Sequence, residues 1–421
     1  MMDTSGQSNS AVPPFEKAKT GHTLGEIEPA GSRQNWRRSA VAVADDRVVA
    51  GSADGTISAF HADGTPQWSV SDGPDTPIVS LSVTDELVIA GHRGPEGRVR
   101  VLSAETGTVQ WEYVTAEDVG SPTDETLFAQ PYVVDSARTD DLLVVASRRF
   151  DRDGSDRQWS SVVYGFELDG SLRWAFDAER SVTGFDIGSG VVAIGYNRCP
   201  ADDDGLVVLE KATGEQRFSW TPEMDGDRAV GDVAVTDAGI AVASHADKYG
   251  YLLDWDGNES WSVNLGGEHS VEGETIYSYP NHVAVSDGTA IFVTGNTFAA
   301  ETRDPAHEHP AEHTTVSVEL ESGEFQWKYH HGGFARKIAT GGSLVAVPSA
   351  QQFRIRTADT HQIHLLDITT GASGSVSVAG IPAALDFDGR ALAAIEEPIE
   401  YHDEGIEHGT YQLLTWEINS S

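Results

Sequence analysis

The chain has 421 residues, a length that allows two or three domains or one large all-β ring. Acidic residues outnumber basic ones 66 to 28, which gives a net charge of −38, and the acids are scattered along the chain. This charge argues against binding to nucleic acid or to anionic lipid, because both are negatively charged themselves. Apolar residues make up 39% of the chain, enough for a real core, whereas the single Cys199 excludes an intramolecular disulfide.

A scattered acidic surface with few lysines indicates adaptation to molar salt, where screening removes the self-repulsion. An acidic mimic of nucleic acid is the alternative, but such a mimic would concentrate its charge on one face. The first 20 residues contain neither a basic n-region nor an apolar h-region, and no segment reaches the roughly 18 apolar residues of a membrane-spanning helix. We therefore expect a cytoplasmic monomer whose residues 1–20 are disordered.

A turn glycine is followed four residues later by a large aromatic side chain at six places along the chain. The pairs are Gly64–Trp68, Gly107–Trp111, Gly170–Trp174, Gly214–Phe218, Gly257–Trp261 and Gly323–Trp327, whereas Gly371 leads to Ser375. An alternating run such as "ISAFHADG" or "LVVLEKATG" precedes each glycine and is typical of a strand entering a tight turn. Two further apolar strands precede each run, so every unit contains four strands.

Short strands and tight turns at this period are typical of β-propeller blades. We expect residues 21–421 to form one all-β, eight-bladed propeller of four-stranded blades. Its innermost strands should begin near Ala40, Ile78, Pro131, Thr183, Gly231, His282, Lys337 and Pro382. The last unit lacks an outermost strand, which the segment "HTLGEIEPAGSRQNW" can supply, with Trp36 placed as Trp68 is in its own blade. The repeated tryptophans should cover the gaps between blades, so their predicted role is structural.

The blade pattern, as in "SAETGTVQW" and "EKATGEQRFSW", resembles that of the PQQ-like (quinoprotein-type) propellers over about residues 36–418. The resemblance implies the fold and says little about function. The family includes alcohol dehydrogenases that hold quinone and calcium, and a non-enzymatic lipoprotein of outer-membrane assembly. The single Cys199 cannot form the vicinal cysteine pair of the dehydrogenases, and we find neither the signal sequence nor the lipid-bearing cysteine of the lipoprotein. We therefore expect a non-catalytic, salt-adapted member that does not bind PQQ.

Long insertions fall almost entirely on one face of the predicted propeller, which we call the loop-rich face. They occupy residues 115–131, 148–159, 197–204, 266–280, 296–313, 350–362 and 396–409. The turns on the opposite face, the turn face, are short and rich in glycine. A decorated face on a plain scaffold is where binding is expected.

The ends of the second strands should surround the channel mouth on the loop-rich face. They carry Ser52, His92, Arg148, Tyr196, His245, Asn296, Ser349 and Glu396, which either line a binding site or bond water and neighbouring turns. We expect a partner to dock over blades six to eight, where Tyr277, Tyr279 and His282 offer contact area. Arg336 and Lys337 make this sector the least repulsive for an anionic ligand.

Three histidines in "HEHPAEH", His307, His309 and His313, form the sharpest local cluster and have the spacing of ligands for zinc, copper or nickel. A solvated acidic loop is the alternative, because Pro310 interrupts regular structure. "HDEGIEH" at 402–408 is a weaker candidate, and "DRDGSD" at 151–156 lacks the twelfth-position glutamate of a calcium loop.

The sequence contains no nucleophile elbow, P-loop or zincin helix. We therefore predict a non-catalytic scaffold that binds a protein partner or a small ligand on the loop-rich face. The alternative is an enzyme with a metal or a quinone at the channel mouth. The sequence does not identify the partner.

Overall fold

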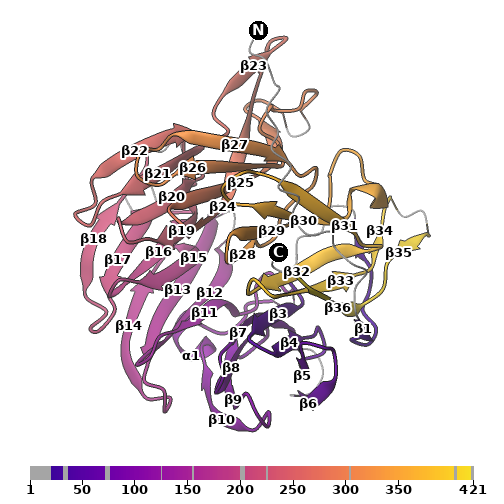
Figure 1. Ribbon diagram of the computed structural model, residues 1–421. Coiled ribbons are helices and arrows are strands. Elements are labelled where there is room, and N and C mark those ends of the chain that lie inside the picture. Colours follow the sequence, from indigo (N-terminus) through magenta and orange to yellow (C-terminus); the bar gives the residue numbers. More distant parts are fainter. Residues whose placement is uncertain are drawn as a thin grey trace.

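The computed structural model describes residues 20–31, 37–71, 76–124, 126–153, 156–199, 204–223, 226–302, 305–402 and 405–418. Their strands form nine sheets, of which eight are the blades of a ring and the ninth is a small three-stranded sheet (Figure 1). The predicted all-β, eight-bladed propeller is confirmed. Residues 1–19 lie outside the described residues, so their disorder stays a prediction. No described helix is long and apolar enough to cross a membrane.

Each of the first four blades is an antiparallel sheet of four consecutive strands. Blade 1 contains β3 (Ala40–Ala44), β4 (Arg47–Gly51), β5 (Thr56–His61) and β6 (Pro66–Ser71). Blade 2 contains β7 (Ile78–Val83), β8 (Leu87–His92), β9 (Arg98–Ser103) and β10 (Val109–Val114). Blade 3 contains β11 (Tyr132–Arg138), β12 (Leu143–Asp153), β13 (Asp156–Phe166) and β14 (Leu172–Ala178). Blade 4 contains β15 (Ser181–Gly188), β16 (Val191–Asn197), β17 (Leu206–Glu210) and β18 (Gln216–Trp220).

The remaining blades include the two departures from the simple pattern. Blade 5 contains β19 (Val230–Val235), β20 (Ile240–Ser244), β21 (Tyr249–Leu253) and β22 (Glu259–Asn264). Blade 6 has a fifth strand, with β23 (His269–Val271) added to β24 (Glu274–Ser286), β25 (Thr289–Ala299), β26 (Thr314–Glu319) and β27 (Phe325–His330). Blade 7 contains β28 (Ala339–Gly341), β29 (Leu344–Ser349), β30 (Gln362–Asp367) and β31 (Ser373–Ser377). Blade 8 joins β32 (Ile381–Phe387), β33 (Ala391–Glu397) and β36 (Gln412–Glu417) to β1 (Thr20–Thr23).

The innermost strands begin close to the predicted residues, with one exception. In blade 6 the inner strand begins at Glu274 rather than near His282, because β23 and β24 continue into a hairpin that projects from the ring (Figure 1). The ninth sheet was not predicted. In it, β2 (Ala30–Gly31) pairs parallel with β34 (Ile399–Glu400), which pairs with β35 (Glu407–His408). Two-residue strands are too short to show a periodic pattern. The described helices are the short α1 (Ala116–Val119) and the 3-10 turn η1 (Ala358–Thr360).

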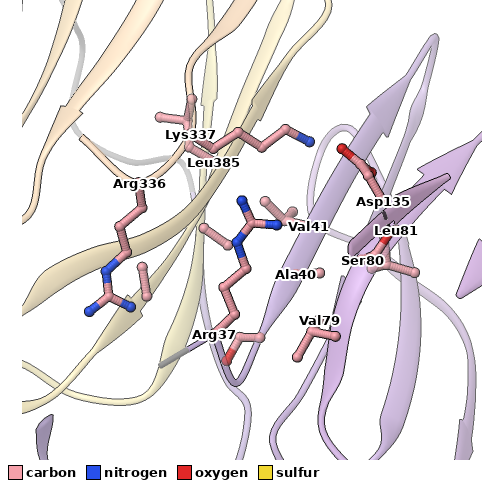
Figure 2. Close-up of a pocket in the computed structure, with 13 residues that line it drawn as sticks. Arg37, Ala40, Val41, Val79, Ser80, Leu81, Asp135, Arg336, Lys337 and Leu385 are labelled. Atoms are coloured by element: carbon pink, nitrogen blue, oxygen red, sulfur yellow. Dashed lines mark hydrogen bonds between the residues drawn. The ribbon is translucent and has the colours of Figure 1, made fainter. Parts of the chain in front are cut away.

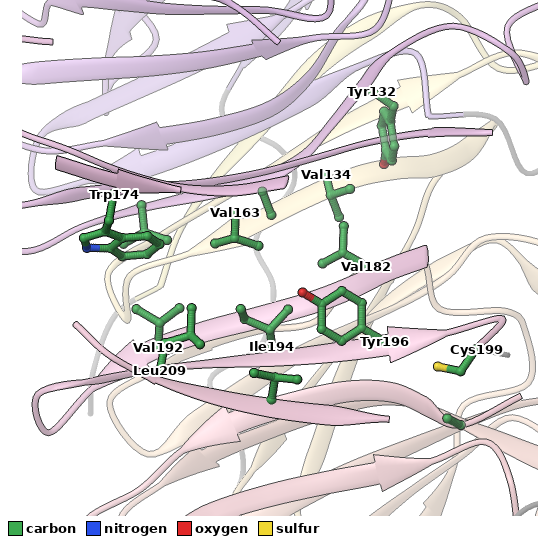
Figure 3. Close-up of a cluster of buried hydrophobic side chains, with 14 of the residues drawn as sticks. Tyr132, Val134, Val163, Trp174, Val182, Val192, Ile194, Tyr196, Cys199 and Leu209 are labelled. Carbon is green, nitrogen blue, oxygen red and sulfur yellow. The ribbon is translucent and has the colours of Figure 1, made fainter. Parts of the chain in front are cut away.

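The core is divided into apolar clusters, one at each of the eight interfaces between neighbouring blades. The cluster between blades 3 and 4, for example, extends from Trp174 at its outer end to Tyr132 and Cys199 near the loop-rich face (Figure 3). The cluster between blades 8 and 1 contains Val41 and Ala50 from one blade and Ala393 and Leu413 from the other. The ring is therefore closed by apolar packing between the first and last blades.

A strand from the N-terminus completes blade 8, as predicted. β1 pairs antiparallel with β36, and Thr20 lies opposite Thr415 in the register position that Trp68 holds opposite Ala59 in blade 1. The strand overlaps the predicted segment at His22 and Thr23 and begins two residues before it, and Trp36 lies outside the described residues. Ring closure by an N-terminal strand leaves blade 8 without an unpaired outer edge on β36.

The repeated glycine and tryptophan belong to the same contact, made between successive blades. The ring of Trp68 in blade 1 packs on Gly107 of blade 2, and its indole N–H donates to the carbonyl of Ala104 at 2.8 Å. The same contact recurs for Trp111 on Gly170, Trp174 on Gly214, Phe218 on Gly257, Trp261 on Gly323 and Trp327 on Gly371. A Cβ at Gly214 would lie 2.7 Å from the ring of Trp174, and its φ of +71° also favours glycine. The pattern therefore records six copies of one interface.

Candidate functional site

The channel mouth on the loop-rich face is formed where the inner strands begin and the second strands end. Two cavities lie there, and both are lined by Arg37, Asp135 and Lys337. The larger measures about 170 Å³ and extends to Asp232 and His282. Arg37 and Lys337 extend into the smaller cavity, with Asp135 across from them, while the guanidinium of Arg336 points elsewhere (Figure 2). The channel mouth therefore carries both positive and negative side chains, although the chain as a whole is strongly acidic.

The channel carboxylates are held by the backbone of the neighbouring blade. Asp386 of blade 8 accepts from the amide of Val43 at 2.8 Å, and Asp186 of blade 4 accepts from Val235 at 2.7 Å. Burial raises the pKa of the Asp186 carboxyl to about 6 and also raises the pKa of Asp386. These groups bond edge amides that would otherwise face the channel, which is a structural role.

Arg148, a predicted site residue, lies where the interface between blades 3 and 4 reaches the loop-rich face. It pairs in register with Tyr132, and its guanidinium lies 5.2 Å from the Tyr132 ring centroid and 5.5 Å from that of Trp159. The same guanidinium donates to the Ser181 hydroxyl at 2.6 Å and the Val182 carbonyl at 2.7 Å. Burial lowers the pKa of Arg148 to about 10.

The aromatic residues predicted at the entry to blade 6 do come together. The rings of Tyr277 and Tyr279 lie 5.4 Å apart, and Phe298 from β25 lies 5.0 Å from Tyr279. His245 packs against Tyr279 with 4.9 Å between centroids, and burial lowers the pKa of this histidine to about 3. Arg228 also stacks on Tyr279, with its guanidinium 4.6 Å from the ring centroid.

His282 connects this group to the channel. Its Nδ1 lies 3.6 Å from a carboxylate oxygen of Asp232, and its Nε2 lies 3.0 Å from the carbonyl oxygen of Ala335. Lys337 lines the same cavity. Three of the predicted site residues, His245, His282 and Lys337, therefore belong to the region between Tyr279 and the channel.

Several predicted rim residues are buried or hydrogen-bonded to other residues of the chain. Tyr196 is fully buried in the core between blades 3 and 4, under the guanidinium of Arg180. Glu396 is buried and accepts from the amides of Thr410 and Ala379. Others bond nearby residues or line a separate cavity: Ser52 (Asp54 carboxylate and Thr56 carbonyl), Ser349 (Thr360 carbonyl), Asn296 (His313) and His92 (a cavity with Thr76 and Arg98).

Arg336 lies inside the fold rather than on the rim. It is 8% exposed, and Glu397 and Arg38 are among the charges that act on its pKa, which burial lowers. Arg38 donates to buried Glu397 at 2.7 Å, and Ser39 donates to the second oxygen of the same carboxylate at 2.9 Å. Arg336 therefore borders the closing interface of blades 8 and 1.

The three histidines of "HEHPAEH" have three different partners. His307 Nδ1 lies 3.0 Å from Glu274, His309 Nε2 lies 3.0 Å from the Gly267 carbonyl, and His313 Nε2 lies 3.0 Å from the Asn296 side-chain oxygen. Across the described residues, no group of three or more His, Cys, Asp or Glu side chains is arranged to hold a metal ion. The structure offers these imidazoles no preformed ligand set, and metal binding at this loop stays a prediction.

The quinone and calcium of the dehydrogenases can be tested against the channel residues in the same way. Asp135, Asp232 and His282 are the channel-mouth groups with metal-binding chemistry, but they do not form such a cluster in the described chain. Among the described residues, the channel mouth therefore presents no preformed set of calcium ligands.

Exposed apolar side chains gather on the loop-rich face. Among the described large apolar residues that are exposed, Phe128, Phe298, Ile355 and Ile406 lie in its insertions and are between 38% and 58% exposed. Leu172 and Phe325 follow short turns on the turn face. Phe128 packs on Phe150 with 4.1 Å between centroids, and Phe150 packs on Trp159 at 4.8 Å. Two aromatic groups, around Phe128 and around Phe298, therefore lie on the loop-rich face.

Three functional candidates were missed by the sequence reasoning: Arg37, Arg180 and Arg228. All three lie in links before inner strands, where no periodic pattern exists. The available signal was their position, directly upstream of the predicted strand starts at Ala40, Thr183 and Gly231.

Comparisons with known proteins agree with this architecture. Residues 18–168 match the family model described as "Outer membrane protein assembly factor BamB". No curated protein matches the chain in sequence. BamB from Moraxella catarrhalis is 16% identical over 90% of this chain and 94% of its own, with a TM-score of 0.58. A quinohemoprotein alcohol dehydrogenase from Comamonas testosteroni is 11% identical over 98% and 78%, with a TM-score of 0.62. The computationally designed Ika8 protein is 16% identical over 93% and 100%, with a TM-score of 0.60.

Proposed function

We propose that this chain, a member of the PQQ-like β-propellers, is a non-catalytic scaffold that binds a partner protein on its loop-rich face. The observation that carries the proposal is the placement of exposed Phe128, Phe298, Ile355 and Ile406 in the insertions of that face. Exposed apolar groups beside aromatic residues and arginine are typical of the central parts of protein interfaces. BamB, an outer membrane protein assembly factor, has the same fold.

The partner must tolerate a strongly acidic chain. Apolar contact does not depend on charge, so these side chains can bind where electrostatic attraction is weak. The predicted docking sector over blades 6 to 8 contains Phe298, Ile355 and Ile406, and Phe128 extends the surface to the link between blades 2 and 3. We therefore propose a docking surface that surrounds the channel mouth.

Capture of the partner from the native host, followed by mass spectrometry, tests this proposal with matched variants. One variant replaces Phe128, Phe298, Ile355 and Ile406 by Ser, and the control replaces Leu172 and Phe325 by Ser on the turn face. We expect the loop-face variant to lose the captured protein and the control to retain it, with both melting near the parent. Equal capture by the loop-face variant would contradict the proposal.

The second candidate is an enzyme with its site at the channel mouth. It is favoured by one observation, the proximity of His282 to Asp232 in a cavity that Arg37 and Lys337 also line. A cofactor bound there would be visible in the absorption spectrum and in metal analysis of protein purified in high salt. A stoichiometric metal or quinone would support the enzyme and count against the scaffold.

A further inference from the structure

Three arginines on the loop-rich face each stack on a tyrosine, and the three tyrosines belong to three different blades. Arg148 lies 5.2 Å from the centroid of Tyr132 in blade 3, and Arg180 lies 4.6 Å from that of Tyr196 in blade 4. Arg228 lies 4.6 Å from the centroid of Tyr279 in blade 6. We call these three pairs the arginine arc, because they follow the rim from blade 3 to blade 6.

The arginines of the arc have no ion pair with a carboxylate in the described chain. Arg148 donates to a hydroxyl and a carbonyl, and Arg180 donates to the backbone carbonyl of Asp204 at 2.6 Å. Their neighbours do have ion pairs. Arg149 lies 3.1 Å from Asp151, and Arg198 binds both oxygens of Asp227, the carboxylate next to Arg228. With 66 acids and 28 bases, carboxylates are abundant in the chain, yet none pairs with these three guanidiniums among the described residues.

The stacking fixes these guanidiniums while leaving them able to bind. Each of the three side chains is partly exposed, and its tyrosine is buried or nearly so. A guanidinium stacked on an aromatic ring keeps its edge N–H groups directed outward, where they can bind a carboxylate with two parallel hydrogen bonds. The rings also limit the motion that binding would otherwise have to restrict.

Apolar groups lie at both ends of the arc. Arg148 also lies over Trp159, which contacts Phe128 and Phe150, and Tyr279 contacts Phe298 at the other end. A small inorganic anion would use the arginines and leave these apolar side chains in water. A polypeptide that carries both carboxylates and large apolar side chains would use both.

We infer that the arginine arc binds an acidic segment of the partner protein, with carboxylates on Arg148, Arg180 and Arg228 and apolar side chains beside Phe128 and Phe298. This inference rests on the proposed function and names the chemistry of the partner. It places the charged part of the docking surface over blades 3 to 6, next to the sector predicted from the sequence. A single-stranded nucleic acid, which also presents anions and rings, is treated as an outcome of the test.

Selection from a displayed library of random twelve-residue peptides tests the inference without knowledge of the partner. The bait is the full chain at the lowest salt that preserves its near-ultraviolet circular dichroism. A triple variant, R148Q/R180Q/R228Q, is compared with a turn-face control, R138Q/R173Q/R217Q, which removes the same charge. We expect the parent and the control to enrich peptides with several Asp or Glu and an aromatic residue, and the triple variant to lose this enrichment.

Binding of one enriched peptide is then measured by fluorescence anisotropy. We expect its dissociation constant to rise at least tenfold in the triple variant and in an analogue with Asn and Gln in place of Asp and Glu. Enrichment of peptides without excess acid, or equal binding by the triple variant, would overturn the inference. Competition by oligo(dT) at lower concentration than by the unlabelled peptide would also overturn it, in favour of nucleic acid.

Comparison with partner capture separates the two proposals. If the Ser variants of the loop-rich face abolish capture while R148Q/R180Q/R228Q does not, the scaffold function stands and the acidic segment is wrong. If both sets abolish capture and the control does not, both proposals are supported. If neither does, both are wrong.

Discussion

The six interfaces that join blades 1 to 7 differ from the closing interface between blades 8 and 1. Each of the six has an aromatic ring of one blade on a turn glycine of the next, and both residues lie within one repeat period. At the closing interface the outer strand is β1, and buried Glu397 binds Arg38 and Ser39, which are 359 and 358 residues away in sequence. Tyr411 joins the network through Ser39 and the amide of Ala53. The comparison teaches that the six repeated interfaces use residues close in the sequence, whereas the closing interface adds a buried polar network to its apolar packing and depends on both ends of the chain.

Withdrawal of salt is expected to have the largest effect. The net charge of −38 repels itself unless the Debye length falls toward about 3 Å, near 1 M salt. We expect the protein to unfold as salt is dialysed away, and hydrogen exchange to show β1, β33 and β36 losing protection before blades 2 to 5. Full stability in dilute buffer would refute salt adaptation, and simultaneous loss of protection everywhere would contradict the weaker closure.

Deletion of residues 1–38 is expected to destabilise the ring more than any single substitution. The deletion removes β1 and Arg38, and it leaves Glu397 as a buried charge without its guanidinium partner. Loss of one partner of a buried ion pair alone costs about 3–5 kcal/mol. Deletion of residues 1–15 is the control and should leave the urea midpoint unchanged. Equal midpoints for the parent and the longer deletion would show that the ends do not support each other.

Trp174→Ala should destabilise by about 3–5 kcal/mol, the cost typical of removing a buried large aromatic side chain. Trp174 is 7% exposed, packs on Gly214 and donates to the Lys211 carbonyl at 2.9 Å. Trp327→Ala should cost less, because that ring is only partly buried. Chemical denaturation of both variants measures the difference, and an equal cost would mean that burial does not set the strength of these interfaces.

The smallest expected effect is the pH dependence of stability that arises from His364, which joins blades 6 and 7. Burial lowers the pKa of His364 to about 4, while the Tyr329 hydroxyl and the His331 carbonyl lie 3.1 and 3.0 Å from its ring nitrogens. An unfolded histidine binds a proton below about pH 6.5, so the stability from neutral His364 is present above that pH and is lost as pH falls toward 4. Each pH unit in this window should cost about 1.4 kcal/mol.

The difference between the parent and His364→Gln, measured at each pH, isolates this contribution. Asp186 has a raised pKa and changes stability in the opposite direction, but it is present in both proteins and cancels. We expect the stability advantage of the parent over the variant to shrink between pH 6.5 and 4.5. A constant difference would mean that His364 does not titrate on unfolding in this range.

The blades could be predicted because their signals are local. Gly107 and Trp111, four residues apart, identify a turn and an outer strand, and all seven turn glycines have the positive φ that their role requires. The position of β1 was predicted only approximately, because Thr20–Thr23 carries no aromatic signal. The parallel pair of Ala30 with Ile399 was missed because nothing local connects residues so far apart.

The candidate site could be predicted only in part, because its contacts join different blades. Strand-end counting found Arg148, and the residues expected at the entry to blade 6 included Tyr277 and Tyr279. It did not find Arg180 or Arg228, since their tyrosines lie on separate strands, in the case of Arg228 on another blade. It also placed Arg336 on the rim, where the fold instead buries it.

The contact of each aromatic ring with the next turn glycine has a consequence for how such chains change in evolution. Each of blades 2 to 6 carries one ring for the blade that follows and one glycine for the blade before it, so a duplicated gene segment of one such repeat brings both halves of the contact with it. A copy that begins or ends within a repeat would leave a ring without its glycine. Ring size can therefore grow or shrink in whole repeats, whereas the strand and charges that join the two chain ends must be kept through every such event.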